Sequence, residues 1–209
     1  MKSLASALLA GTILAGPALA QEMPSMAPDR DVSGTYLITK TGGQPSQQSM
    51  AMEYSKSSGT LRVNMPQNQG MAGYILYDFG TKDAKMVMPQ MQKYMDYSTM
   101  AAGFTSMAHA HQGGASGDDV SITRGGSETI AGHECHDIIA TDHTKNKTAT
   151  LCLTDDHVLL SMTSSDGFSL VAQSISYGAV PDSDVQVPPG FTEFVMPQMP
   201  AGMGAGPGQ

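Results

Sequence analysis

The sequence contains no tryptophan, and aromatic residues make up only 6% of its 209 positions. Methionine, in contrast, occurs 17 times, and the tripeptide Met-Pro-Gln begins at Met65, Met88 and Met196. Sulfur has therefore replaced part of the aromatic material as the large apolar component of the chain. The methionines either pack against other apolar groups or bind a ligand.

Positive charge is also scarce. Eleven Lys and Arg stand against 19 Asp and Glu, which gives a formal net charge of −8. Loss of the leader described next removes Lys2 and leaves 10 − 19 = −9. A field of this sign makes nucleic acid and anionic lipid surfaces poor partners.

No apolar run is long enough to cross a bilayer as a helix. The run Leu4 to Leu14 is short, follows Lys2, and precedes Ala18-Leu19-Ala20, which fits the small-x-small rule for signal peptidase. The pattern predicts a signal peptide over residues 1–20, cleaved after Ala20, and the absence of Cys there argues against a lipid anchor. We expect a soluble protein with no transmembrane segment in an exported compartment, most simply a bacterial periplasm.

The remaining chain is long enough for one domain with a real core. We expect a flexible N-terminal segment at 21–31, because its sequence lacks periodicity, and a single β-rich domain at 32–197. Residues 198–209 are rich in Pro, Gly and Met and carry no charge, so we expect a disordered tail.

Within the domain, short runs rich in Tyr, Val, Ile, Thr and Met alternate with turn residues every eight to twelve positions, which is typical of β-strands. The expected strands are Gly34–Lys40, Met50–Tyr54, Thr60–Met65, Gly73–Phe79, Lys85–Met88, Lys93–Tyr97, Val120–Arg124, His133–Thr141, Thr148–Thr154, Val158–Thr163, Ser169–Tyr177 and Phe191–Val195. Ser165-Asp166-Gly167 indicates a hairpin turn, whereas Gly125-Gly126 indicates a simple turn.

One stretch favours a helix. Ser98 to His111 opens on a capping-type Ser and places Met100, Phe104, Met107 and His111 at helical spacing. A lone sheet must bury its apolar face against another element. The sequence therefore predicts a mainly β protein in which one antiparallel sheet is covered by one helix.

The two cysteines predict a disulfide, because an exported compartment is oxidising. If Cys135 lies directly opposite Cys152 on adjacent antiparallel strands, residues 142–145 form a four-residue loop between them. His136, Ile138, Ala140, Ala149, Leu151 and Leu153 then share one mostly apolar face. Free thiols for metal or redox work are the alternative.

Several motifs around this hairpin resemble a known family. They are the runs Glu128–Cys135, Cys152 with Thr154-Asp155-Asp156, Ile175–Gly178 and Val187–Phe191, together with the Met-rich run at 86–95. They are similar to the exported bacterial domain-of-unknown-function 4412 family, which looks related to the periplasmic outer-membrane lipoprotein carriers (the LolA-like superfamily). The resemblance implies an antiparallel half-barrel around helices, with an apolar concave face able to hold an acyl chain. It implies no catalytic residues.

No catalytic motif stands out. His133-Glu134-Cys135-His136-Asp137 is not a zinc protease motif, because the second His falls one residue early and the segment has strand character. Asp155-Asp156-His157 could orient a histidine as a general base. We interpret it as a polar turn between strands, because no nucleophile lies nearby in the sequence.

The methionines allow two interpretations. As packing or apolar-ligand residues, the helix stripe Met100, Phe104 and Met107 would line a binding face. As soft thioether ligands for Cu(I), the candidates are Met86, Met88 and Met91, together with Met107 and His111. A tight turn at Pro89-Gln90 would bring Met88 opposite Met91, and a longer loop would part them.

We therefore expect a non-enzymatic periplasmic binding protein without a cofactor, holding a lipophilic small molecule or a lipoprotein. A copper-binding protein is the alternative, and a structural envelope factor is a third hypothesis. These hypotheses differ in what the purified protein should carry, a lipid or a stoichiometric metal ion.

Intact mass or N-terminal sequencing of exported protein should place the first residue at Gln21. The expectation rests on the leader pattern that ends at Ala20. A mature protein that kept Leu4 to Leu14 would make the membrane surface the first place to look for partners.

Overall fold

The computed structural model describes residues 24–41, 45–65, 73–99 and 120–195. These residues form twelve strands and two short 3-10 turns. In chain order the elements are β1 (Val32–Lys40), β2 (Ser46–Ser55), β3 (Thr60–Asn64), β4 (Tyr74–Asp78), β5 (Ala84–Met88), η1 (Pro89–Met91), β6 (Lys93–Asp96), β7 (Val120–Ile130), β8 (His133–Asp142), β9 (Lys147–Leu153), β10 (Leu159–Ser164), β11 (Phe168–Tyr177), η2 (Asp182–Val185) and β12 (Thr192–Glu193).

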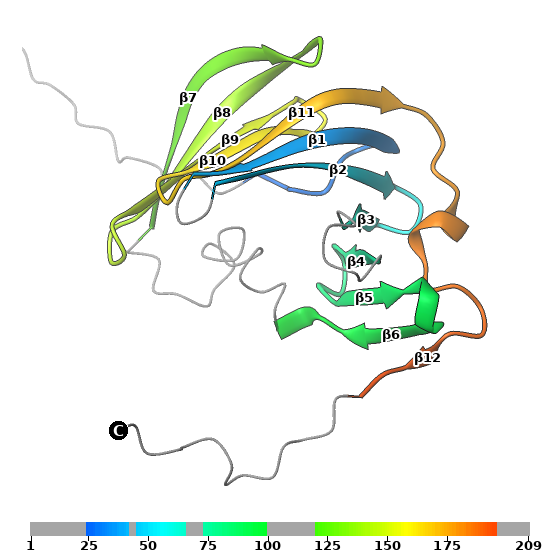
Figure 1. Ribbon diagram of the computed structural model, residues 1–209. Helices are drawn as coiled ribbons and strands as arrows, with labels where there is room; N and C mark the ends of the chain where they lie inside the picture. The colour runs from blue at the N-terminus through cyan, green and yellow to red at the C-terminus, as the bar shows by residue number, and fades with distance from the viewer. Residues whose placement is uncertain (1–23, 42–44, 66–72, 100–119, 196–209) are drawn as a thin grey trace, which may run out of the picture.

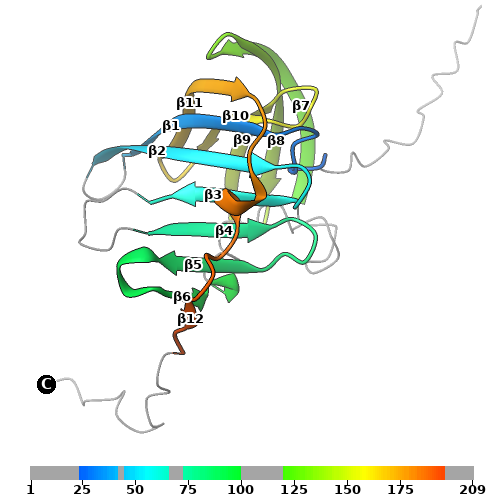
Figure 2. The same ribbon diagram turned by 90° about the vertical axis from the view of Figure 1, so that its right-hand side faces the viewer.

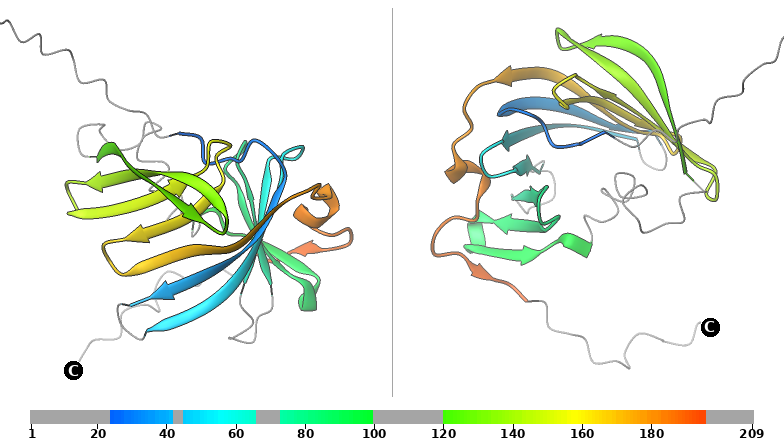
Figure 3. Two further views of the ribbon diagram at one scale, coloured as in Figure 1. Left: turned by 90° about the horizontal axis from the view of Figure 1, so that it is seen from above. Right: turned by 180° about the vertical axis from the view of Figure 1, so that it is seen from behind.

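All twelve strands belong to one sheet, in the order β12-β6-β5-β4-β3-β2-β1-β11-β10-β9-β8-β7. Neighbours are antiparallel except β12, which runs parallel to β6. The sheet is strongly curved, and its two edge strands, β7 and β12, lie far apart (Figure 1 and Figure 3). The expectation of a mainly β protein built on one antiparallel sheet is confirmed, and this sheet does not close into a barrel.

The covering helix expected over Ser98–His111 is not borne out. Ser98 and Thr99 are helical at the edge of the described residues, and apart from them the described part of the chain has only the 3-10 turns η1 and η2 as helical elements. Residues 100–111 of the expected helix, including Met100, Phe104, Met107 and His111, lie outside the described residues. No helix of the described residues is long and apolar enough to cross a membrane.

The expected strands are observed, and their bounds differ from the expected ones at bulges and at strand ends. Ser165–Gly167 joins β10 to β11 as expected, and Gly167 takes a positive φ of 84°, which glycine adopts without steric cost. Gly125 and Gly126 do not form a turn, which corrects the expectation. They sit inside β7 at a bulge between Arg124 and Ser127. A Cβ at Gly125 would come within 2.7 Å of the Asp137 Cβ, so only glycine fits there.

The disulfide between Cys135 and Cys152 is confirmed, but the expected register is not. The Cα atoms of the two cysteines are 5.3 Å apart, yet Cys152 lies opposite Asp137. Asp142 explains the shift: hydrogen bonds from the Thr144 hydroxyl and the Lys145 N–H lower its pKa to about 2 and fix the start of the turn. The loop therefore spans residues 143–146, and the bridge joins the strands diagonally.

A shift of two residues preserves which side chains share a face. The apolar set expected for one face of the β8–β9 hairpin is therefore found together, as three directly opposite pairs. These pairs are His136 with Leu153, Ile138 with Leu151, and Ala140 with Ala149.

The main core lies where β1, β2, β10 and β11 meet the cysteine bridge. Its buried members are Val32, Tyr36, Met50, Tyr54, Cys135, Cys152, Val158, Leu160, Leu170 and Ala172. Tyr36 donates its hydroxyl hydrogen bond to the Leu159 carbonyl, at 2.9 Å. Burial raises the pKa of the Tyr36 hydroxyl, so Tyr36 stays protonated and keeps this donor at neutral pH.

The described end of the N-terminal segment is held against the β9–β10 turn. Asp29 N–H donates to the Asp156 carbonyl at 2.9 Å, and Arg30 Nε lies 2.6 Å from the Asp156 carboxylate. The Asp31 carboxylate accepts from the N–H groups of Lys56 and Val180. The expectation of a flexible segment at 21–31 did not include these contacts.

The chain after β11 crosses the outer surface of the curved sheet before it ends in β12 (Figure 2). Val187 and Phe191 of this crossing segment pack against the buried side chains of Tyr74, Leu76 and Val87. Further along the same surface, the Arg62 guanidinium donates to the Asp184 carbonyl at 2.9 Å and lies 3.9 Å from the Tyr74 ring centroid. These contacts identify the outer face of the sheet as the face that the crossing segment covers.

Replacing both cysteines with Ala should lower the free energy of unfolding by roughly 3 kcal/mol, the chain-entropy value for a loop closed by 17 residues of separation. Far-UV circular dichroism should remain that of a β-sheet, because eleven of the twelve strands are also held by antiparallel neighbours. Urea unfolding of the oxidised wild type and the variant measures the difference. Equal stability would show that the bridge constrains nothing in the unfolded chain.

Asp182 should make the crossing segment sensitive to acid. Hydrogen bonds from the hydroxyls of Ser57 and Ser55 hold the pKa of its carboxyl below the ordinary 3.8. A depressed folded-state pKa contributes stability above about pH 4, and this contribution is lost as the pH falls through the folded pKa. Asp182→Ala should therefore be less stable than the wild type at neutral pH and converge with it in acid.

Chemical denaturation at several pH values tests this expectation. Asp184→Ala is the matched control, because it removes one charge from the same 3-10 turn and leaves the Ser55 and Ser57 contacts to Asp182 intact. A constant stability difference between wild type and Asp182→Ala across the acid range would contradict the proposed role of the carboxylate.

Candidate functional site

The candidate site is the inner face of the curved sheet, opposite the face that the crossing segment covers. Residues directly opposite each other on neighbouring strands share a face. One unbroken line of such pairs runs across seven strands, and we call it the central row. It comprises Ile175, Gly34, Met52, Val63, Ile75, Met86 and Met95.

The central row lies on the inner side because the outer side of the same strands is already assigned. Tyr74 and Val87 lie opposite each other and pack against Val187 and Phe191 of the crossing segment. Ile75 and Met86 are the next residues along β4 and β5, so their side chains point the other way. The inner face of β3 to β6 is therefore the side without the crossing segment (Figure 3).

Further rows of apolar side chains lie on both sides of the central row, and Gln48, Lys93 and Arg124 are among the polar residues on the same face. One flanking row contains Tyr177, Val32, Tyr54, Leu61, Tyr77 and Ala84. The other contains Ile38, Leu170, Met162, Leu151 and Ile138. An apolar face spanning this many strands can hold a lipophilic molecule by surface burial alone.

Methionines are concentrated on this face. Met50, Met86 and Met88 are buried, at 7%, 8% and 7% exposure, and Met52 and Met95 are half-buried. The space that a side chain at Gly34 would need is already filled, because a Cβ there would come within 2.7 Å of the Ser174 carbonyl oxygen and 2.8 Å of Ile175 Cδ1. The flexible thioether side chains suit a surface that must adapt to variable apolar partners.

The structure separates the methionines that were grouped as metal ligands. Met86 and Met88 share the inner face of β5, as expected. The chain takes the longer of the two loops: η1 holds Met91, which is 52% exposed, and Met88 lies opposite Lys93. Met91 is therefore not beside Met88.

Met95 is the inner-face residue that the sequence did not assign to this group. It lies directly opposite Met86. The left-handed conformation of Gln92, with φ of 50°, ends η1 and sets this register. The sequence positions of Met86 and Met95 indicate that the two residues are paired only when the length of the turn between β5 and β6 is known.

The remaining residues chosen from the sequence, Met100, Phe104, Met107 and His111, lie outside the described part of the chain. Their role as an apolar binding stripe, or as metal ligands in the case of Met107 and His111, stays a prediction. In the described residues no group of three His, Cys, Asp or Glu side chains could hold a metal ion.

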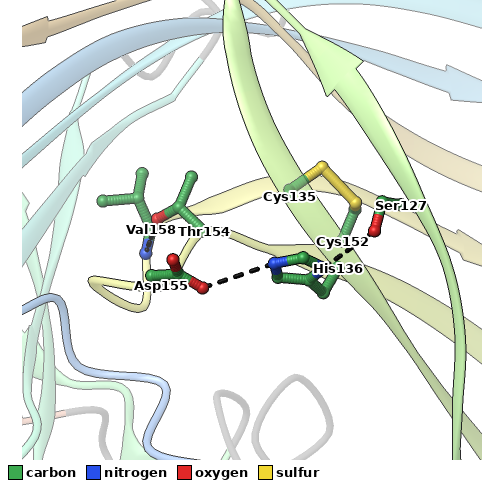
Figure 4. Close-up of a disulfide and its surroundings, with 7 residues drawn as sticks. All are labelled: Ser127, Cys135, His136, Cys152, Thr154, Asp155 and Val158. Atoms are coloured by element: carbon green, nitrogen blue, oxygen red, sulfur yellow. Dashed lines mark hydrogen bonds and ion pairs between the residues drawn. A yellow bond between two sulfur atoms is a disulfide. The ribbon is translucent and has the colours of Figure 1, made fainter.

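The polar turn after β9, Asp155-Asp156-His157, contacts β8 and the N-terminal segment. Asp155 lies 3.4 Å from His136 Nε2, and Ser127 Oγ lies 2.8 Å from Nδ1 of the same ring (Figure 4). His136 and Asp155 are 55% and 95% exposed, so bulk water surrounds the pair. Asp156 pairs with Arg30, and His157 Nδ1 lies 3.1 Å from Asp29.

Two cavities lie mainly along the outer face and differ in character from the inner face. One, of about 280 Å³, is lined by Asp83, Lys85, Asp96, Glu193 and neighbouring residues. The other, of about 260 Å³, is lined by Arg62, Asn64, Gly73 and Gln90 among others. Charged and polar groups dominate the first cavity, whereas Met65, Tyr74 and Pro89 also line the second.

Comparison with known proteins identifies the relatives of this sheet. The model of a domain of unknown function, DUF4412, matches residues 37–175. No curated protein matches the chain.

Solved structures are similar to this chain, and the first two below, with TM-scores of 0.50 or above, show a likeness of fold. An uncharacterized conserved protein from Thermus thermophilus has a TM-score of 0.51 at 7% identity, over 79% of this chain and 90% of that one. MucB, in complex with MucA(peri), has a TM-score of 0.50 at 14% identity, over 77% of this chain and 55% of MucB. A LolA superfamily protein from Nitrosomonas europaea has a TM-score of 0.38 at 8% identity, over 77% and 94%.

Proposed function

The chain belongs to the DUF4412 family, as its motifs predicted, and we propose that it is an exported, non-enzymatic binding protein that holds a lipophilic molecule on the inner face of its sheet. The observation that carries the proposal is the central row, in which seven strands place six apolar side chains and one glycine in register. An acyl chain is the simplest ligand of this shape.

The two faces of the sheet support this assignment. On the outer face, apolar side chains are already covered by Val187 and Phe191. On the inner face, Met52, Val63, Ile75 and Met95 are only half-buried. Apolar surface of this extent gains free energy when a ligand removes it from water, at about 25 cal/mol per Å².

The methionine content supports a ligand of variable shape. Unbranched thioether side chains change rotamer at little cost and so fit chains of different length or saturation. The resemblance of the sequence to a family related to the lipoprotein carriers also favours an acyl chain.

A periplasmic location fits the cysteine bridge, which persists in oxidising compartments. It also fits the leader pattern at residues 1–20. The solved complex of MucB with MucA(peri) makes a protein partner a second class of occupant to examine. In that case a peptide, rather than a lipid, would cover the inner face.

Native mass spectrometry of protein purified without detergent should detect a co-purifying lipid, and the delipidated protein should bind an environment-sensitive hydrophobic dye. The double variant Met52→Gln and Val63→Thr changes two directly opposite side chains to polar groups of similar size. A buried polar group without a partner costs roughly 1–3 kcal/mol. Dye binding should therefore weaken about tenfold or more.

Two controls make this result interpretable. Met52→Leu with Val63→Ile keeps the inner face apolar and should retain dye binding. Val195→Gln changes an apolar side chain that is 74% exposed and should have no effect. Protein that carries no lipid, and whose dye binding is the same in all variants, would rule out the inner face as a lipophile site.

A further inference from the structure

Three methionines converge at one end of the inner face. Met86 lies directly opposite Met95, and Met88 is two residues further along β5 on the same face. Opposite residues of antiparallel strands have Cβ atoms about 5 Å apart, and positions i and i+2 of a strand are about 7 Å apart. Because a methionine sulfur is two bonds beyond Cβ, three sulfurs anchored at these positions can reach one point.

The chemistry of this group is that of a soft-metal site. Thioether sulfur prefers Cu(I) over hard cations, and it stays a neutral ligand where thiols are oxidised. Both cysteines are bonded to each other, so no thiol of this chain competes. Within the described ranges no His, Cys, Asp or Glu cluster offers a harder site.

We propose that Met86, Met88 and Met95 form a three-thioether site for Cu(I) or another soft monovalent cation. The site shares Met86 and Met95 with the central row, but it uses their sulfur atoms, whereas lipophile binding uses the apolar surface of the same side chains. It replaces the group that included Met91, whose side chain is in an exposed turn.

Lys93 is a charged residue beside this trio, since it lies opposite Met88. Its ammonium group lies 5.3 Å from the centroid of the Phe194 ring, a cation–π distance. Phe194 follows the edge strand β12, so the positive charge is held toward the sheet edge. Met86 and Met95 lie two residues away from Met88 and Lys93 along their strands. The next residue of their row is the apolar Ile75 on β4.

Met50 and Met52 are two residues apart on one face of β2, as Met86 and Met88 are on β5, but no methionine lies directly opposite either of them, so they provide a matched control. Met50 lies opposite Tyr36, and Met52 lies between Gly34 and Val63. Met162 lies between Leu151 and Leu170. Each of these three has no methionine directly opposite it.

The test is Cu(I) uptake by the mature chain in ascorbate, measured by competition with a chromogenic chelator and by native mass spectrometry. Ascorbate keeps copper reduced without opening the buried cysteine bridge, which would otherwise add two thiolates. The variant Met86→Leu, Met88→Leu and Met95→Leu should lose stoichiometric uptake and keep its fold, because Leu and Met have similar volume. Silver(I) should follow the same pattern.

The control variant Met50→Leu, Met52→Leu and Met162→Leu should bind Cu(I) as the wild type does. Unchanged uptake by the first variant, or equal loss in both, would overturn the proposal. If the triple change disturbs folding, Met95→Leu alone at a half-buried position decides, since it removes one of three ligands. Dye binding should survive in every Leu variant, so failure of the metal site and failure of the lipophile site give different results.

Discussion

The antiparallel register is the constraint on which the rest of the molecule depends. Each residue of the central row is placed by the hydrogen-bonded ladder on either side of it, and side chains alternate between faces with a period of two. A slip of one residue in any ladder would send the methionines of the strands beyond it to the outer face. The central row crosses β1 and β11 at Gly34 and Ile175. The bulge between Thr35 and Tyr36 lies beyond this pair along the strand and therefore does not interrupt the row.

Much of the sheet could be predicted from the sequence, because period-two alternation and turn residues are local signals. The cysteine bridge and the Ser165–Gly167 turn are of this kind. The bulge at Gly125-Gly126 was missed because its cause is Asp137, a residue of another strand. The partner of Met86 was missed for a similar reason: it depends on the conformation of one residue, Gln92, which sequence spacing does not encode.

The crossing segment anchors the outer face of the sheet, while side chains of the inner face such as Val32, Tyr54 and Leu170 belong to the main core. The crossing segment fills the outer face with Val187 and Phe191 and is fastened through Asp182 and the Asp184 carbonyl to β2, β3 and the turn between them. The crossing segment stabilises the sheet through contacts on the outer face and leaves the inner face uncovered by that segment. A protein that binds on one face of a single sheet needs some such anchoring on the other, because a sheet apolar on both sides must cover both.

The bulge in β7 also limits how this chain meets copies of itself. β7, of eleven residues, is an edge strand of the described sheet, and the backbone groups on the side away from β8 would be a template for a neighbour's strand. The two glycines break that edge into stretches of five and four paired residues, 120–124 and 127–130, with Arg124 and Glu128 beside the break. The same close approach to Asp137 that admits only glycine thus shortens the surface on which strand-to-strand aggregation could begin.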